Sequence, residues 1–163
     1  MTKLDIISSK IITIEILKFR LAYWRTFQKK IVFTNGCFDI LHFGHIDYLS
    51  KASDLGHILI IGLNSDESVK RLKGMTRPIN KQTERALMLA ALQFVNNIVV
   101  FEEDTPEELI KFIKPDVIVK GNEYKPEEIA GADFVIANGG EVVTIELTKG
   151  FSTSILIEKL INK

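Results

Sequence analysis

The feature that most constrains the fold of this 163-residue chain is a regular alternation of short apolar runs with amphipathic segments. The runs are rich in β-branched residues and are bounded by turn residues, which is typical of strands buried on both faces of a sheet. Between them, apolar residues recur at the three-residue spacing of one helix face. We expect strands at 31–34, 58–63, 98–101, 117–119, 134–137 and 142–145.

Strands that alternate with helices predict an α/β protein with a Rossmann-like, three-layer α/β/α architecture and a mostly parallel sheet. We assign this domain to residues 30–163. Residues 1–29 are expected to form an N-terminal helical extension, because 14–27 is amphipathic and contains Trp24 and Phe27. In such sheets ligands bind beyond the carboxyl ends of the strands, where the strand order switches. The segment after the first strand is therefore the expected location of a functional site.

Composition argues against several classes of function. Basic and acidic residues are equal at 21 each, so no global positive charge favours nucleic-acid binding. Cys37 is the single cysteine, which excludes an internal disulfide, and no Cys/His cluster has the spacing of a zinc site. The apolar runs are too short to span a bilayer, and the N-terminus lacks a signal-peptide core. We expect a cytoplasmic protein without nucleic-acid or membrane partners and without a protein-built metal site.

The segment richest in chemistry follows the first predicted strand and reads TNGCFDILHFGH over residues 34–45. His42 and His45 are three positions apart, so they face the same way on a helical turn. Gly44 between them lets a phosphate approach the backbone closely, and a helix N-terminus favours anions. Two imidazoles beside such a site can hold phosphate oxygens. The spacing alone is equally compatible with two structural histidines, and a zinc pair lacks an evident third ligand.

The motif HFGH at 42–45, preceded by GCFD at 36–39, resembles the signature of the cytidylyltransferase-like nucleotidyltransferases. The longer string NGCFDILHFGHIDYL is similar to the adenylyltransferases of bacterial ADP-heptose synthesis. The similarity covers roughly residues 30–161 and includes RLKG at 71–74 and GFSTS at 150–154. The resemblance implies transfer of AMP from ATP to D-glycero-β-D-manno-heptose 1-phosphate, with release of pyrophosphate, for lipopolysaccharide core synthesis.

The resemblance also implies roles for individual residues. His42 and His45 would bind and polarise the triphosphate, and Lys73 would neutralise the leaving pyrophosphate as a mobile point charge. The expected ligands of the sugar phosphate are Asp39, Arg77 and Arg85. The expected nucleotide-binding residues lie near strand ends and at helix starts: Asn35, Gly36, Cys37, Phe38, Gly44, Asn64, Gly121, Asn122, Glu123, Ser152, Thr153 and Ser154.

Several of these assignments have a structural alternative. Lys73 could be a solvated loop lysine, and Arg85 could form a surface ion pair with Glu84 or a neighbour. Ser152 could cap a last helix without any ligand. For Cys37 we favour a buried turn residue over a nucleophile, because no ordered base is implied beside it.

The sequence leaves the substrate pair open. The main alternative is CTP with glycerol 3-phosphate or another polyol or amino-alcohol phosphate, and a nucleotide-binding module without activity is the second. Leu147 and Gln93 stand where the glycerol-phosphate enzymes carry arginine, which argues against that branch. Mg²⁺ is expected to arrive with the triphosphate. We also expect a homo-oligomer, such as a dimer, and a heptose kinase supplied by a separate protein.

Overall fold

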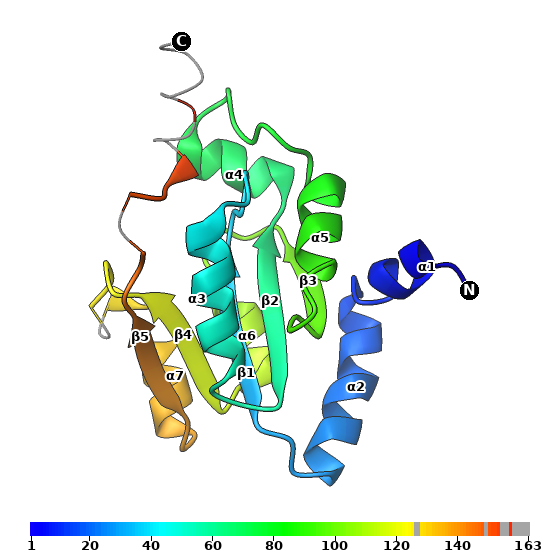
Figure 1. Ribbon diagram of the computed structural model, residues 1–163. Coiled ribbons are helices and arrows are strands. Elements are labelled where there is room, and N and C mark those ends of the chain that lie inside the picture. The colour runs from blue at the N-terminus through cyan, green and yellow to red at the C-terminus, as the bar shows by residue number, and fades with distance from the viewer. Residues whose placement is uncertain (126–127, 149, 154–156, 158–163) are drawn as a thin grey trace.

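A single parallel sheet forms the centre of the computed structural model, which describes residues 1–125, 128–148, 150–153 and 157 (Figure 1). The five strands lie in the order β3-β2-β1-β4-β5, and every neighbouring pair is parallel. This confirms the expected Rossmann-like α/β class. The strands are β1 (Ile31–Gly36), β2 (Ile58–Asn64), β3 (Asn97–Phe101), β4 (Val117–Gly121) and β5 (Glu141–Ile145).

Helices cover both faces of the sheet, because the buried strands present apolar side chains alternately to each side. On β1, Ile31 and Phe33 pack with α2, α6 and α7, whereas Val32 packs with α3 and α5. Figure 1 shows α3 in front of the sheet and α6 behind it. The helices are α1 (Lys3–Ser8), α2 (Ile14–Thr26), α3 (Phe43–Ser53), α4 (Asp66–Lys73), α5 (Gln82–Ala90), α6 (Glu107–Ile113) and α7 (Ala132–Ala137).

One predicted strand is wrong. Residues 134–137 belong to α7, so the described sheet has five strands instead of the six expected from the sequence. Gly131 precedes the helix with a φ of 80°, and Ala132 and Val135 are buried three positions apart on one helix face. A four-residue apolar run fits a buried strand and a short helix equally well, since neither period is completed within it.

The N-terminal residues cover both a face and an edge of the sheet. Leu17 and Leu21 of α2 are buried in the same apolar cluster as Phe33 of β1. Before α2, Ile12 N donates to Ile98 O at 2.9 Å and Ile98 N donates to Lys10 O at 2.9 Å. These bonds occupy backbone groups on the outer side of β3 that would otherwise form an open strand edge. A boundary at residues 29 and 30 stays a prediction.

The strand order fixes where a ligand can bind. The chain leaves β1 through α3 and enters β2 on one side, whereas β4 lies against the other side of β1. The carboxyl ends of β1 and β4 therefore flank the point where the order switches, which is the usual ligand position in open α/β sheets. Separately, no helix in the described part of the chain has the length and apolar character needed to cross a membrane.

The packing of α2 leads to a stability prediction. Leu17→Ala removes a fully buried side chain, so we expect the free energy of unfolding to fall by about 2–5 kcal/mol. Ile16→Ala is the matched control, because the neighbouring Ile16 is 46% exposed and its loss should cost less than about 1 kcal/mol. Urea unfolding of the two variants measures the difference. Equal effects would show that α2 does not contribute Leu17 to the core in solution.

Candidate active site

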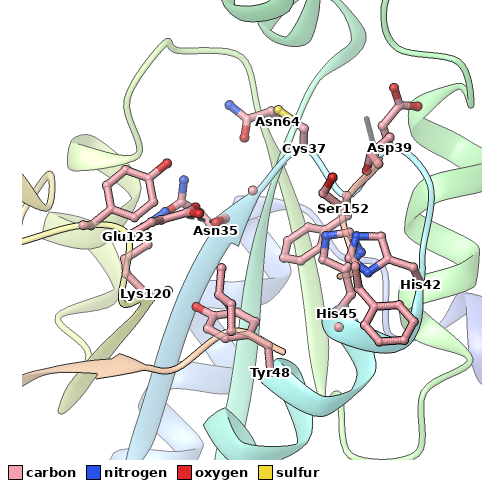
Figure 2. Close-up of a pocket in the computed structure, with 18 of the residues that line it drawn as sticks. Asn35, Cys37, Asp39, His42, His45, Tyr48, Asn64, Lys120, Glu123 and Ser152 are labelled. Atoms are coloured by element: carbon pink, nitrogen blue, oxygen red, sulfur yellow. Dashed lines mark hydrogen bonds between the residues drawn. The ribbon is translucent and has the colours of Figure 1, made fainter. Parts of the chain in front are cut away.

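A pocket of about 570 Å³ opens at the carboxyl ends of β1 and β4 (Figure 2). The loop after β1, the first turn of α3, the end of α4 and the segments after β4 and β5 form its wall. Residues far apart in the sequence thus converge at the switch point. The predicted site residues that line this pocket are Asn35, Gly36, Cys37, Phe38, Asp39, His42, Gly44, His45, Asn64, Lys73, Gly121, Glu123, Ser152 and Thr153.

Four predicted residues are not among those that line the pocket. Arg77, Arg85 and Asn122 lie outside its wall, and Ser154 lies outside the described residues. Asn122 instead supports the neighbouring backbone, since its N–H donates to Ile145 O at 2.9 Å. The roles proposed for these residues stay predictions.

The two histidines of the motif form a stacked pair at the start of α3. His42 occupies the N-cap position, and the rings of His42 and His45 lie 3.8 Å apart between centroids at an angle of 21°. Within the described part of the chain, the Nδ1 atoms of both rings are buried and make no hydrogen bond. Gly44 keeps the pair compact, because a Cβ atom there would lie 3.2 Å from the His42 ring and 3.1 Å from Phe151 Cβ.

Burial keeps both imidazoles neutral. It lowers the pKa of His42, and together with the charges of His42 and Lys73 it lowers the pKa of His45 to about 4. A neutral imidazole carries one N–H donor and one acceptor nitrogen. The pair can therefore donate hydrogen bonds to an anion at the helix N-terminus, where the free backbone N–H groups and the helix dipole also favour negative charge.

Phe38 shapes the turn that leads from β1 to α3. Its φ is 44°, in the left-handed region that bulky residues rarely adopt, yet its side chain is almost fully buried. The ring meets His45 edge-on, with 5.3 Å between centroids. Backbone strain of this kind is concentrated at functional sites, where the surrounding packing maintains it. The contact fixes the orientation of His45 toward the pocket.

Asp39 ties the turn after β1 to the loop between α4 and α5. This carboxylate is 3% exposed, and its Oδ2 lies 2.5 Å from Arg77 Nε. Its Oδ1 accepts from the backbone N–H groups of Ile79 at 2.8 Å and Asn80 at 3.0 Å. Asp39 and Arg77 therefore neutralise each other in this structure, and both make structural contacts that the sequence did not indicate.

Arg85 is a fully buried cation of α5 rather than half of a surface ion pair. Its Nη2 donates to Asp66 Oδ1 at 2.8 Å, so its acidic partner is Asp66 rather than Glu84, which was named in the structural alternative. Its Nη1 donates to Cys37 O at 2.6 Å and its Nε donates to Asn80 O at 3.0 Å. Because the guanidinium is occupied by these three acceptors, Arg85 acts in this structure as a positioning residue for the turn that carries Cys37.

Sequence reasoning missed several residues of the pocket wall. The most informative is Lys120, a cation at the end of the otherwise apolar strand β4, whose position in the pattern VIVKG was an available signal. Tyr48 bridges two strand ends beneath the pocket, since its hydroxyl lies 2.7 Å from Thr34 Oγ1 and donates to Val119 O at 2.9 Å. The other lining residues to which no binding role was assigned are Leu72, Asp104, Tyr124, Leu147, Thr148 and Phe151.

The pocket offers cations and backbone N–H groups rather than a metal cage. In the part of the chain that the structure describes, no three His, Cys, Asp or Glu side chains are grouped so that they could hold a metal ion. Lys73 lines the pocket at the end of α4 and is solvent-exposed, so it is free to move toward a ligand. The arrangement suits a polyphosphate anion.

The lowered pKa of His45 leads to a prediction about stability and pH. An unfolded histidine titrates near 6.5, so between about pH 6.5 and 4 only the unfolded chain binds a proton at this position. The free energy of unfolding should therefore fall as pH decreases through this window, by a contribution on the order of 3 kcal/mol. Urea unfolding of wild type and His45→Gln at several pH values isolates this contribution as a difference. If the free energies of unfolding of the two proteins changed in parallel with pH, this contribution of His45 would be contradicted.

Comparison with curated proteins shows that the chain is similar to part of proteins named as bifunctional. The chain is 60% identical over 136 residues to "bifunctional protein HldE" of Campylobacter jejuni subsp. jejuni serotype O:2, covering 83% of this chain and 29% of the relative. It is 50% identical over 155 residues to the protein of that name from Syntrophotalea carbinolica, covering 95% of this chain and 32% of the relative. The chain thus spans less than a third of the length of these relatives.

Comparison with solved structures and protein families agrees with the observed fold. The lipopolysaccharide core biosynthesis protein of Thermoplasma volcanium superposes with a TM-score of 0.59 at 28% identity, covering 76% of this chain and 99% of that protein. The Cytidylyltransferase-like family matches residues 33–159, which include the histidine pair and all the residues that line the pocket. The chain therefore belongs to the cytidylyltransferase-like family, and with it to the nucleotidyltransferases.

Proposed function

We propose that the chain transfers AMP from ATP to D-glycero-β-D-manno-heptose 1-phosphate, giving ADP-heptose and pyrophosphate. The observation that carries this proposal is the stacked, neutral pair of His42 and His45 at the start of α3, in a pocket at the switch point of the sheet. The pair supplies donors where a triphosphate would meet the helix N-terminus. The high identity to HldE proteins and the likeness to a lipopolysaccharide core biosynthesis protein support the choice of a heptose phosphate.

The reaction is a single in-line displacement. An oxygen of the ionised acceptor phosphate forms a bond to the α-phosphorus of ATP, while the bond from that phosphorus to the α,β-bridging oxygen breaks. The electron pair of the broken bond leaves with pyrophosphate, so the reaction needs no protein nucleophile and no proton abstraction. Catalysis then consists of positioning and charge stabilisation.

Different residues of the pocket would contribute to positioning and to charge stabilisation. His42 and His45 would donate hydrogen bonds to oxygens of the triphosphate, and these bonds strengthen as negative charge builds on the leaving group. Lys73, exposed at the end of α4, would move in to neutralise pyrophosphate. Asp39 and Arg85 would act indirectly, because their contacts hold the turn between β1 and α3 in place.

Mg²⁺ fits this scheme as a partner of the nucleotide. Mg²⁺ in nucleotide sites usually keeps several waters and binds phosphate oxygens of the substrate. When bound, it would offset charge on the phosphates. The residues of this chain would then hold the triphosphate through the histidine pair and the N-terminus of α3.

The pocket also bears on the choice of base and acceptor. Leu147 lines the pocket, at the position where the glycerol-phosphate cytidylyltransferases carry arginine. It packs closely on Gly121, because a Cβ atom at Gly121 would lie 2.9 Å from Leu147 Cδ1. An apolar side chain at this position adds no donor for a phosphate. It favours the adenylyltransferase branch over transfer from CTP to a polyol phosphate.

The test of the function is pyrophosphate release in the presence of Mg²⁺. ATP, CTP, GTP and UTP are each combined with D-glycero-β-D-manno-heptose 1-phosphate and with glycerol 3-phosphate. We expect release with ATP and the heptose phosphate. Release with CTP and glycerol 3-phosphate would replace the substrates and keep the mechanism. Binding of nucleotide without release from any pair would favour a binding module and contradict an enzymatic function.

The histidine pair gives a second prediction. His42→Ala and His45→Ala should each lower kcat by about 10²-fold or more, as expected for the loss of a donor to the transition state. His57→Ala is the control, because His57 precedes β2 at the opposite end of the sheet and its Nδ1 accepts only from Lys30 N among the described contacts. Turnover is measured on variants whose circular dichroism is unchanged. Near-normal turnover in the folded double variant would exclude this role.

A further inference from the structure

A cationic side chain faces the pocket from the side opposite to the neutral histidine pair. Lys120 ends the apolar run of β4, its Nζ donates to Asn35 O at 3.1 Å, and it lies 5.6 Å from the centre of the Tyr124 ring. Figure 2 shows Lys120 on one side of the β1 strand end, with His42 and His45 on the other. The pocket therefore lies between two groups of anion-binding side chains.

The backbone explains why a side chain is needed at this point. β1 pairs with β2 along its whole length, through six residue pairs, but with β4 only at Val32 and Phe33. Beyond these pairs the carboxyl ends of β1 and β4 are no longer joined by ladder hydrogen bonds. The Lys120 ammonium bridges the gap to Asn35 O, so it sits in the opening that the separated strands create.

The charge of Lys120 is poorly compensated. Among the described residues it makes one hydrogen bond and no ion pair, although an ammonium group has three donors. Burial lowers the pKa of Lys120 to about 8, with only partial opposition from Cys37 and from the exposed carboxylate of Glu123. A partly buried ammonium without a carboxylate partner lowers stability, and such groups are characteristic of binding sites.

A purely structural role does not account for the charge. Bridging β1 and β4 needs one neutral donor, and Tyr48 already provides such a bridge between Thr34 and Val119. The two remaining donors of Lys120 and its positive charge would be unnecessary for that purpose. An incoming anion would accept hydrogen bonds from the two remaining donors and would be attracted by the positive charge.

We infer that Lys120 binds the phosphate of the acceptor substrate and so places the attacking oxygen. The inference rests on the proposed function, and it assigns a further binding residue to that site. In an in-line displacement the attacking and leaving oxygens lie on opposite sides of the α-phosphorus. If pyrophosphate leaves toward His42, His45 and Lys73, the acceptor phosphate must enter from the side of Lys120.

Steady-state kinetics of three variants test this role. Lys120→Met keeps most of the length of the unbranched side chain and removes its charge, and Lys120→Arg keeps the charge. Lys125→Met is the control at an exposed lysine outside the pocket wall. We expect Lys120→Met to raise KM for the acceptor phosphate by about 10-fold or more while KM for ATP changes less than about 3-fold. Lys120→Arg should recover most of the loss. An equal or larger rise in KM for ATP, or no change in either KM, would overturn the inference.

A labelling experiment tests the site without requiring turnover. Acetic anhydride labels lysines of the wild-type protein while a non-transferable ATP analogue fills the nucleotide site, and mass spectrometry measures the rate at Lys120 and Lys125. Added inorganic phosphate should slow labelling of Lys120 and leave Lys125 unchanged. Full protection of Lys120 by the ATP analogue alone, or no protection by phosphate, would contradict the assignment of Lys120 to the acceptor phosphate. If phosphate protects Lys120 but no substrate pair releases pyrophosphate, the anion site stands and the proposed function fails.

Discussion

The buried guanidinium of Arg85 is the interaction on which the geometry of the pocket depends. It joins three segments that are distant in the sequence, because it contacts Cys37 O after β1, Asn80 O before α5 and Asp66 at the start of α4. A buried cation is costly unless each donor direction meets an acceptor, so the three segments are held in one arrangement. Asp39 adds the complementary anion, with Arg77 and two backbone N–H groups around it. Together these contacts fix the turn that presents the histidine pair.

The histidine pair works under a constraint that follows from this packing. Two stacked rings 3.8 Å apart cannot both become imidazolium cations without strong repulsion, and burial adds to that penalty. The free site is therefore neutral at its centre, while the positive end of α3, Lys73 and Lys120 surround it. An anion that enters gains favourable interactions from the start of α3, from Lys73 and from Lys120. The lowered pKa of each ring makes it a weak base, and each neutral ring still offers one N–H donor, which suits a reaction whose nucleophile is already ionised.

The parts of the site encoded by local pattern could be predicted from the sequence, and the parts that depend on tertiary contacts could not. The run from Asn35 to His45 reads as strand, turn and helix start, and the structure brings that run into one pocket wall. Residues 134–137 were mistaken for a strand, because four apolar residues complete neither a helical nor an extended period. The burial of Arg85 was missed, since its partners lie up to 48 residues away. Lys120 fills the gap between the carboxyl ends of β1 and β4, and this separation of the strands cannot be predicted from a local sequence pattern.

The segment after β5 completes the pocket by filling space that two glycines leave open. Leu147 packs on Gly121, and Phe151 packs on Gly44 and contacts the Phe43 ring at a tilt of 58°, with 5.3 Å between ring centres. A side chain at Gly121 would collide with Leu147, so the backbone at the end of β4 can approach this segment only because it carries no Cβ. Leu147 and Phe151 thus line the pocket together with Ser152 and Thr153. Ser152, from this segment, lies beside the histidine pair (Figure 2), so polar groups after β5 reach the same wall of the pocket as the start of α3.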